Sequence, residues 1–135
     1  MSMRRVTSPK LIKVDTDGMD CEILMSSAVL LGQARPVLFF EYDPYLTQLA
    51  GPKAQEVFPF LLSLGYRRML VYENTGDFLI TADLDDHRLM GELHDFYLGR
   101  KSIRYADVCV FHADDLDLCD DIRRSELNYF NGVRT

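Results

Sequence analysis

Five short runs of apolar residues along the chain predict β-strands. The run Pro36–Phe40 is apolar at consecutive positions, which is typical of a strand covered on both faces of a sheet. Asn74–Asp77 has the composition of a tight turn, so the runs on either side of it predict a hairpin. The five predicted strands are Leu11–Val14, Pro36–Phe40, Arg68–Tyr72, Phe78–Ala82 and Asp107–Phe111.

Between these runs, apolar residues recur three or four positions apart, as on one face of a helix. This spacing predicts a helix from Met19 to Leu31 that ends at Gly32, then a loop with Gly51 and Pro52. A second helix is predicted at Val57–Leu64, with Gly65 just past its end. A third has Leu89, Leu93, Phe96 and Tyr97 on one face; it would begin after a cap at Asp85 or Asp86 and end at Gly99. A final helix has Leu118, Ile122 and Tyr129 on one face and precedes a frayed tail, Gly132–Thr135.

This alternation of strands and helices predicts an α/β fold, with helices on both faces of one sheet. We expect the sheet to be mostly parallel, with an antiparallel strand near the C-terminus. No repeat or linker-like shift in composition divides the chain. We therefore expect a short N-terminal tail, residues 1–10, and a single domain over residues 11–131.

Composition and charge exclude several classes of partner. The net charge of −6 argues against nucleic acid, whose binding requires a dense basic face. No apolar run approaches the roughly 20 residues that span a bilayer, so we expect no membrane insertion. The cysteines Cys21, Cys109 and Cys119 include no Cys-x-x-Cys pair, which favours a reducing, cytoplasmic location. The histidines lack the spacing of zinc ligands, and no metal site is predicted.

Carboxylates follow the first two predicted strands. Asp15 and Asp17 come after the first strand, and Glu41 and Asp43 after the second. Because ligands of an open α/β sheet gather outside the carboxyl ends of its strands, the four acids would share one rim. Such a rim can bind a metal ion, hold substrate hydroxyls, or supply a general base with a raised pKa. The structural alternative is that Asp17 and Asp20 cap a helix and Asp43 begins a turn.

The segment that contains the first pair of acids also carries a family resemblance. Residues 11–24, LIKVDTDGMDCEIL, resemble the FkbM-family methyltransferase motif I-K-I-D-V-E-G-x-E-x-x-V-L. Gly18 and its spacing from Asp15 match the motif. The glutamate that usually precedes the glycine is Asp17 here, and the next acid is Asp20, so both side chains are one methylene shorter.

Three later segments extend the resemblance over about a hundred residues, from Leu11 to Val110. The sequence RPVLFFEYDP at 35–44 is similar to the family's R-P-x-apolar-F-E strand. The tripeptide LGY at 64–66 resembles a junction of the family, and YADVCV at 105–110 resembles its closing strand.

The resemblance implies the carboxyl-terminal half of a Rossmann-like class I methyltransferase fold. The implied reaction is transfer of a methyl group from S-adenosylmethionine to a hydroxyl of a small molecule, a polyketide or a sugar. It also implies that Asp15, Asp17 and Glu41 are catalytic, by orienting or deprotonating the acceptor. The cofactor would contact Asp15 and Gly18. The acceptor would be bound by Asp43, Tyr42 and Tyr45, although such aromatic residues also commonly serve packing.

The 135 residues contain no Gly-x-Gly turn of the kind that holds the donor in such folds. We therefore expect the usual cofactor-binding half to be missing, and no donor binding by this chain alone. Leu11–Val14 would then be an exposed apolar edge, which predicts a homodimer through that edge or pairing with the missing N-terminal half. The alternative is that Met1–Pro9 or a helix covers the edge.

Two functions are compatible with the sequence. One is an enzyme: the acceptor half of an FkbM-type O-methyltransferase. The other is a non-catalytic module for oligomerisation or small-molecule binding, derived from the same fold. A receiver-like signalling domain also places acids at strand ends, but the order of acids and lysines here does not fit one.

Overall fold

The computed structural model describes residues 10–16, 19–49 and 54–134. Within these ranges, five strands form one sheet in the order β1-β2-β5-β3-β4. The predicted α/β class is confirmed, and each predicted strand is present within a few residues of its expected bounds. The strands are β1 (Leu11–Val14), β2 (Val37–Tyr42), β3 (Tyr66–Glu73), β4 (Phe78–Asp83) and β5 (Ala106–His112).

The strand directions correct the expectation of a mostly parallel sheet. Among the described strands, β1 and β2 pair in parallel, whereas β2–β5, β5–β3 and β3–β4 are antiparallel. The reason is the position of β5, which lies between β2 and β3 and runs opposite to both. Consequently β1, β2 and β3 still point the same way, but β2 and β3 are not neighbours. The predicted turn at Asn74–Asp77 is confirmed and makes β3 and β4 a hairpin.

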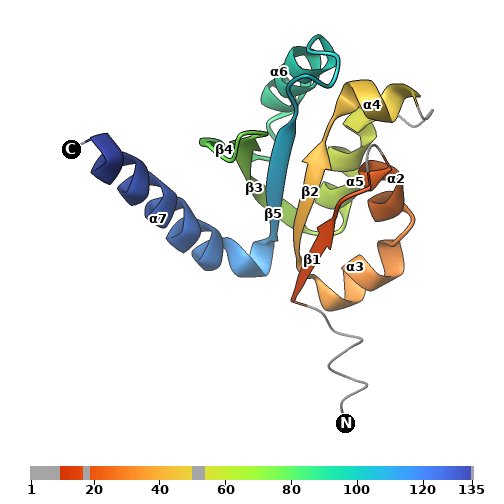
Figure 1. Cartoon of the computed structure of the whole chain (residues 1–135). Helices are drawn as coiled ribbons and strands as arrows, with labels where there is room; N and C mark the ends of the chain where they lie inside the picture. The colour runs from red at the N-terminus through yellow and green to blue at the C-terminus, as the bar shows by residue number, and fades with distance from the viewer. Residues whose placement is uncertain (1–9, 17–18, 50–53, 135) are drawn as a thin grey trace.

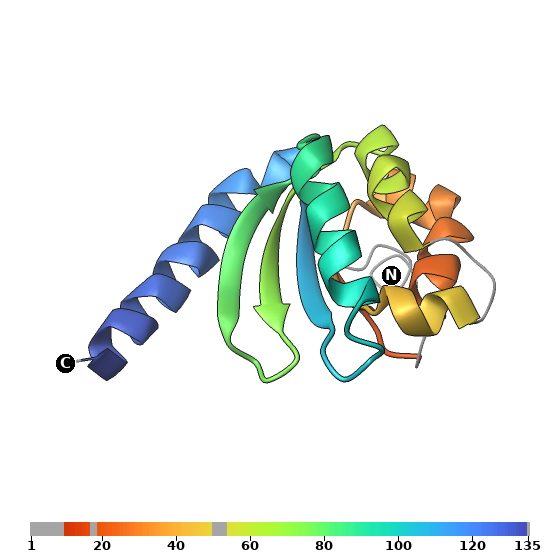
Figure 2. The same ribbon diagram turned by 90° about the horizontal axis from the view of Figure 1, so that it is seen from above.

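Helices lie on both faces of the sheet, as expected, but they cover them unequally (Figures 1 and 2). Most of them pack on one face, while α7 lies on the other and diverges from the sheet towards its C-terminal end (Figure 2). On the first face are α2 (Asp20–Met25), α3 (Ala28–Ala34), α5 (Val57–Ser63) and α6 (His87–Leu98), with α4 (Pro44–Leu49) and the 3-10 turn η1 (Ala54–Glu56) beside α6. A second 3-10 turn, η2 (Ala113–Asp115), leads from β5 into α7 (Leu116–Arg134).

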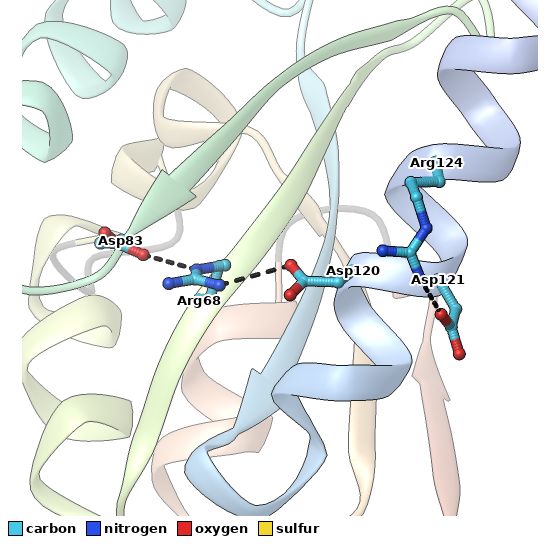
Figure 3. Close-up of polar contacts among 5 residues, drawn as sticks. All are labelled: Arg68, Asp83, Asp120, Asp121 and Arg124. Carbon is cyan, nitrogen blue, oxygen red and sulfur yellow. Dashed lines mark hydrogen bonds and ion pairs between the residues drawn. The ribbon is translucent and has the colours of Figure 1, made fainter.

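The main core lies between the sheet and the first helical layer. It is built from alternate residues of each strand, together with the inner faces of α2, α5 and α6. A smaller cluster lies under α7, where Cys119 packs against Val37, Leu70 and Phe111. One ion-pair network fixes the first part of α7: Arg68 of β3 reaches Asp83 of β4 at 2.7 Å and Asp120 of α7 at 3.5 Å (Figure 3).

Four local predictions need correction. The helix predicted from Met19 to Leu31 is broken into α2 and α3, because the hydroxyls of Ser26 and Ser27 both donate to the carbonyl of Ile23 at 2.8 Å. Gly32 does not end this helix: α3 continues to Ala34 and terminates at Arg35, which adopts φ 49°. The region predicted as a loop after Asp43 contains α4, while Gly51 and Pro52 lie outside the described residues. The predicted tail from Gly132 instead belongs to α7, which continues through Arg134.

β1 is an edge strand, and its first residue, Leu11, is 62% exposed. The alternative to an exposed edge was that Met1–Pro9 or a helix covers it, and residues 1–9 lie outside the described part of the chain. The helices of the described segments include none that is both long enough and apolar enough to cross a bilayer.

Gly65, at the junction of α5 and β3, lies in close contact with the side chain of His112. Its φ is +97°, and a Cβ placed there would lie 2.4 Å from Nε2 of the buried His112. Gly76 has a similar φ of +93° with nothing within 4 Å of its Cβ position, so Gly76→Ala is a matched control for backbone strain alone. We expect Gly76→Ala to cost about 1 kcal/mol of unfolding free energy, and Gly65→Ala to cost about 1–3 kcal/mol more.

Urea denaturation of both variants measures this difference. Equal losses for Gly65→Ala and Gly76→Ala would contradict the close packing of His112 against Gly65.

Candidate functional site

Two carboxylates lie opposite each other near the carboxyl end of β2. Glu41 pairs in register with Asp107 of β5, and directly opposite residues of neighbouring strands share one face of a sheet. Their Cβ atoms are therefore about 4.5–5.5 Å apart. The pair is on the same face of the sheet as α7 (Figure 2). However, α7 borders the β3–β4 hairpin at one edge of the sheet, whereas β2 is near the other edge. Asp15, which directly follows β1, adds a third acid near the pair. Glu41, Asp107 and Asp15 together form the acidic rim of the sheet.

The surroundings of Glu41 and Asp107 raise the pKa of both carboxyls. Burial raises the pKa of Glu41 to about 7, with further contributions from the negative charges of Asp20, Asp107, Asp15 and Asp43. The pKa of Asp107 is also raised, first by burial and then by Asp15, while Lys13 on β1 opposes the shift. Near neutral pH, Glu41 therefore exchanges between its protonated and ionised forms, which is the property of an effective general base.

Asp20 holds this rim together. Its side chain is almost completely buried, and its Oδ1 accepts hydrogen bonds from the Thr16 backbone N–H at 2.9 Å and from the Thr16 hydroxyl at 2.5 Å. Its Oδ2 accepts from the backbone N–H of Glu41 at 3.0 Å. The prediction that Asp20 caps the helix is wrong: α2 begins at Asp20, and its N-cap residue is Met19. Asp20 instead joins the turn after β1 to the end of β2.

Asp43 has the structural role that was the alternative to ligand binding. It is buried, stands directly before Pro44 at the start of α4, and accepts from the backbone N–H of Leu46 at 3.1 Å. The same Oδ1 accepts from the hydroxyl of Ser102 at 3.0 Å. Asp43 therefore ties the segment before β5 to the end of β2, close enough to raise the pKa of Glu41 by its charge.

The two tyrosines predicted to bind the acceptor do not join the pair of carboxylates. Tyr42 follows Glu41 in β2, so its side chain enters the main core on the opposite face, where it is 1% exposed. Its hydroxyl lies 2.8 Å from Nδ1 of His94, and its ring packs on Phe58. Tyr45 is half-buried in the first turn of α4.

The remaining residues implied by the family resemblance are placed only in part. Asp15 is exposed at the end of β1, near enough to Glu41 and Asp107 for its charge to affect both. Asp17 and Gly18 lie outside the described residues. The structure therefore brings together Asp15 and Glu41 of the predicted set.

Sequence reasoning missed Asp107 and Tyr105 as site residues. Both were visible in the segment Tyr105–Val110, but they were assigned only to a strand. The start of β5 reaches the rim because β5 runs antiparallel to β2, so its first residues lie beside the last residues of β2. Partial burial and the charges of Glu41 and Asp107 raise the pKa of Tyr105 as well. Recognising β5 as an antiparallel neighbour of β2 would have revealed both residues.

Across residues 10–16, 19–49 and 54–134, no group of three or more His, Cys, Asp or Glu side chains is placed to hold a metal ion.

The raised pKa of Glu41 makes a prediction about stability and pH. Because the folded state holds this proton up to about pH 7 while the ordinary value is 4.5, the unfolded state loses it first as the pH rises. The stability that protonated Glu41 contributes is present below pH 4.5 and is lost as the pH rises to about 7. We expect Glu41→Gln to unfold at a higher urea concentration than the wild type at pH 8, and the advantage to shrink towards pH 4.5.

Asp85→Asn, which removes an exposed acid from the turn before α6, is the control for the general loss of a negative charge. A Glu41→Gln profile that runs parallel to that of Asp85→Asn at every pH would show that Glu41 titrates normally.

Comparison of the chain with protein-family models, with curated proteins and with solved structures found no match in any of the three.

Proposed function

We propose that this chain is the acceptor side of an FkbM-type, S-adenosylmethionine-dependent O-methyltransferase that acts on a hydroxyl of a small molecule, polyketide or sugar. The observation that carries the proposal is the rim formed by Glu41, Asp107 and Asp15 at the ends of three neighbouring strands. Removing a proton from a hydroxyl near neutral pH requires a base whose pKa is near 7, and Glu41 has that pKa.

The topology is compatible with this proposal. Three strands, β1, β2 and β3, share one direction, and β5 is inserted antiparallel between β2 and β3. A class I methyltransferase sheet of which only the carboxyl-terminal half is present would have a late antiparallel strand of this kind. We propose that β1–β5 correspond to that half of the partial Rossmann-like fold.

Within the rim, the residues of this chain have distinct roles. Glu41 accepts the proton of the acceptor hydroxyl. Burial and the charges of Asp20, Asp107 and Asp15 keep its pKa high. Asp107 and Asp15 also offer oxygens to neighbouring hydroxyls of the acceptor. Asp20 holds the backbone of Glu41 and acts as a positioning residue. We expect this chemistry in the cytoplasm, where Cys21, Cys109 and Cys119, all unpaired, remain thiols.

The donor, when bound, supplies an electrophilic methyl group. Of the residues implied to hold it, Asp15 is exposed at the rim and Gly18 lies outside the described residues. Because the 135 residues contain no Gly-x-Gly turn, Asp15 and Gly18 are too few to form a binding site for the donor. We propose that another polypeptide segment provides the remaining part of the donor site, by adding a strand to the open edge of β1. Pairing of two copies through that edge is the alternative.

The alternative function, a non-catalytic oligomerisation or small-molecule-binding module, is favoured by one specific observation. Asp20 and Asp43, two of the four acids whose charges raise the pKa of Glu41, are buried and engaged in hydrogen bonds that stabilise the fold. Such a rim can persist for structural reasons after catalysis is lost.

Donor binding is tested by calorimetric titration of the purified chain with S-adenosylmethionine. We expect no saturable heat up to millimolar donor, because the chain by itself lacks the cradle for it. Saturable binding in the micromolar range would contradict the incomplete donor site.

Acceptor binding is tested by amide chemical-shift mapping of the chain with a panel of sugars and other polyhydroxylated small molecules. We expect shifts at Asp15, Glu41 and Asp107 with millimolar affinity, and their loss in the Glu41→Gln, Asp107→Asn double variant. Asp85→Asn serves as the control. Shifts that persist in the double variant, or no shifts at the rim with any compound, would contradict an acceptor site there.

A further inference from the structure

The face of the sheet that carries α7 has an apolar hollow beside the first turns of that helix. From there α7 diverges from the sheet along the β3–β4 hairpin, away from β1 and β2 (Figure 2). The hollow has a volume of about 560 Å³, which is within the range of small-molecule sites. Its apolar lining consists of Leu11, Val37, Phe39, Cys109, Leu118 and Ile122.

Strand pairing sets the floor of this hollow and one of its margins. Phe39 of β2 is in register with Cys109 of β5 on one side and with Lys13 of β1 on the other, so the three side chains leave the same face of the sheet. Leu118 and Ile122, about one turn apart on α7, form the opposite wall. From β1 to β5 the hollow crosses two strand spacings, about 10 Å. It is therefore a trough that runs across the strands, from the edge of the sheet to α7.

Two lysines give the margin at the edge of the sheet a positive charge. Among the described residues that line the hollow, the charged ones are Lys10 and Lys13, which we call the lysine margin. Both are exposed, and neither forms a salt bridge within the described part of the chain, although the whole sequence has 21 acids against 15 basic residues. The ammonium of Lys13 lies 5.6 Å from the centre of the Phe39 ring. The hollow thus combines an apolar floor with cations that have no anionic partner.

Acids beyond the hollow restrict where a negative group can bind. Towards the carboxyl ends of the strands lies the acidic rim, where the charge of Lys13 opposes the rise in the pKa of Asp107. Towards the start of α7, Asp114 is already paired with Arg35 at 2.8 Å, and Asp115 lines the same neighbouring depression. An anion is therefore repelled from both ends of the hollow and attracted to the lysine margin.

We propose that this hollow binds a free medium-chain fatty carboxylate, with its carboxylate at the lysine margin and its alkyl chain lying across β2 and β5 towards α7. Most of the lining is branched and aliphatic, and Lys13 already lies over the ring of Phe39. A flexible alkyl chain therefore fits the hollow better than a stacked aromatic ring does. Burial of the chain and the charge of the lysine margin both stabilise such a ligand. The site does not rest on the proposed methyltransferase function.

The first test is amide chemical-shift mapping of the full chain with decanoate, kept below the concentration at which it forms micelles. We expect saturable shifts at Phe39, Cys109 and Leu118. Octanoate, which buries two fewer methylene groups, should bind about tenfold more weakly. Decyltrimethylammonium has the same chain with a positive head group, and we expect no saturable shifts at the hollow with it.

The second test compares matched variants by the same titration. We expect the Lys10→Gln, Lys13→Gln double variant to raise the dissociation constant for decanoate about fivefold, and Lys101→Gln, which removes an exposed lysine outside the hollow, to leave it unchanged. Leu118→Ser should raise it about fivefold or more. Leu127→Ser should have no effect, because Leu127 is on the opposite side of α7.

Absence of saturable shifts at the hollow with millimolar decanoate would overturn the proposal. Equal binding of decanoate and decyltrimethylammonium, or equal binding by the wild type and the double lysine variant, would contradict the role of the lysine margin. Shifts at the hollow that depend on protein concentration alone would show that a second copy covers it. Binding to phosphatidylglycerol vesicles but not to monomeric decanoate would show a membrane surface to be the occupant, and either result would overturn the proposal.

Discussion

The buried carboxylate of Asp20 is the constraint on which the rim depends. It joins two parts of the chain that are far apart in sequence, the turn after β1 and the last residues of β2, by accepting from Thr16 and from the backbone of Glu41. A buried carboxylate is stable only where donors replace its lost hydration. The requirement to satisfy Asp20 therefore fixes the end of β2, and with it the place where the Glu41 side chain emerges.

Two further features crowd the rim with acids. The antiparallel entry of β5 sets Asp107 directly opposite Glu41, and Asp43, which precedes α4, contributes its charge from two positions further along the chain. Each acid has a local reason for its position, yet their charges add to the burial of Glu41 in making its ionisation unfavourable. The resulting pKa of about 7 is a consequence of how the sheet is assembled, and it is the property that gives the rim a chemical use.

Much of the fold could be predicted from local sequence. The consecutive apolar residues of β2, the Asn74–Asp77 turn and the cap formed by Asp86, which accepts from the backbone N–H of Leu89 at 3.1 Å, all carry strong local signals. The pairing of β5 could not be predicted, because the place of a strand in a sheet is decided by long-range packing. That one uncertainty explains both the wrong expectation of a mostly parallel sheet and the missed role of Asp107. The break between α2 and α3 was missed because two serine side chains, not a glycine or proline, cause it.

The central claim is that Glu41 titrates near neutral pH because of its surroundings. The most direct measurement is the pKa of its side-chain carboxyl, followed by NMR through the carboxyl carbon between pH 3 and pH 9. A midpoint near 7, which falls only in part when Asp107 is replaced by asparagine because burial and the charge of Asp20 remain, is the predicted result. A midpoint near 4.5 in the wild-type chain would contradict the account, because the rim would then be a set of independent, solvated acids with no base suited to deprotonating a hydroxyl.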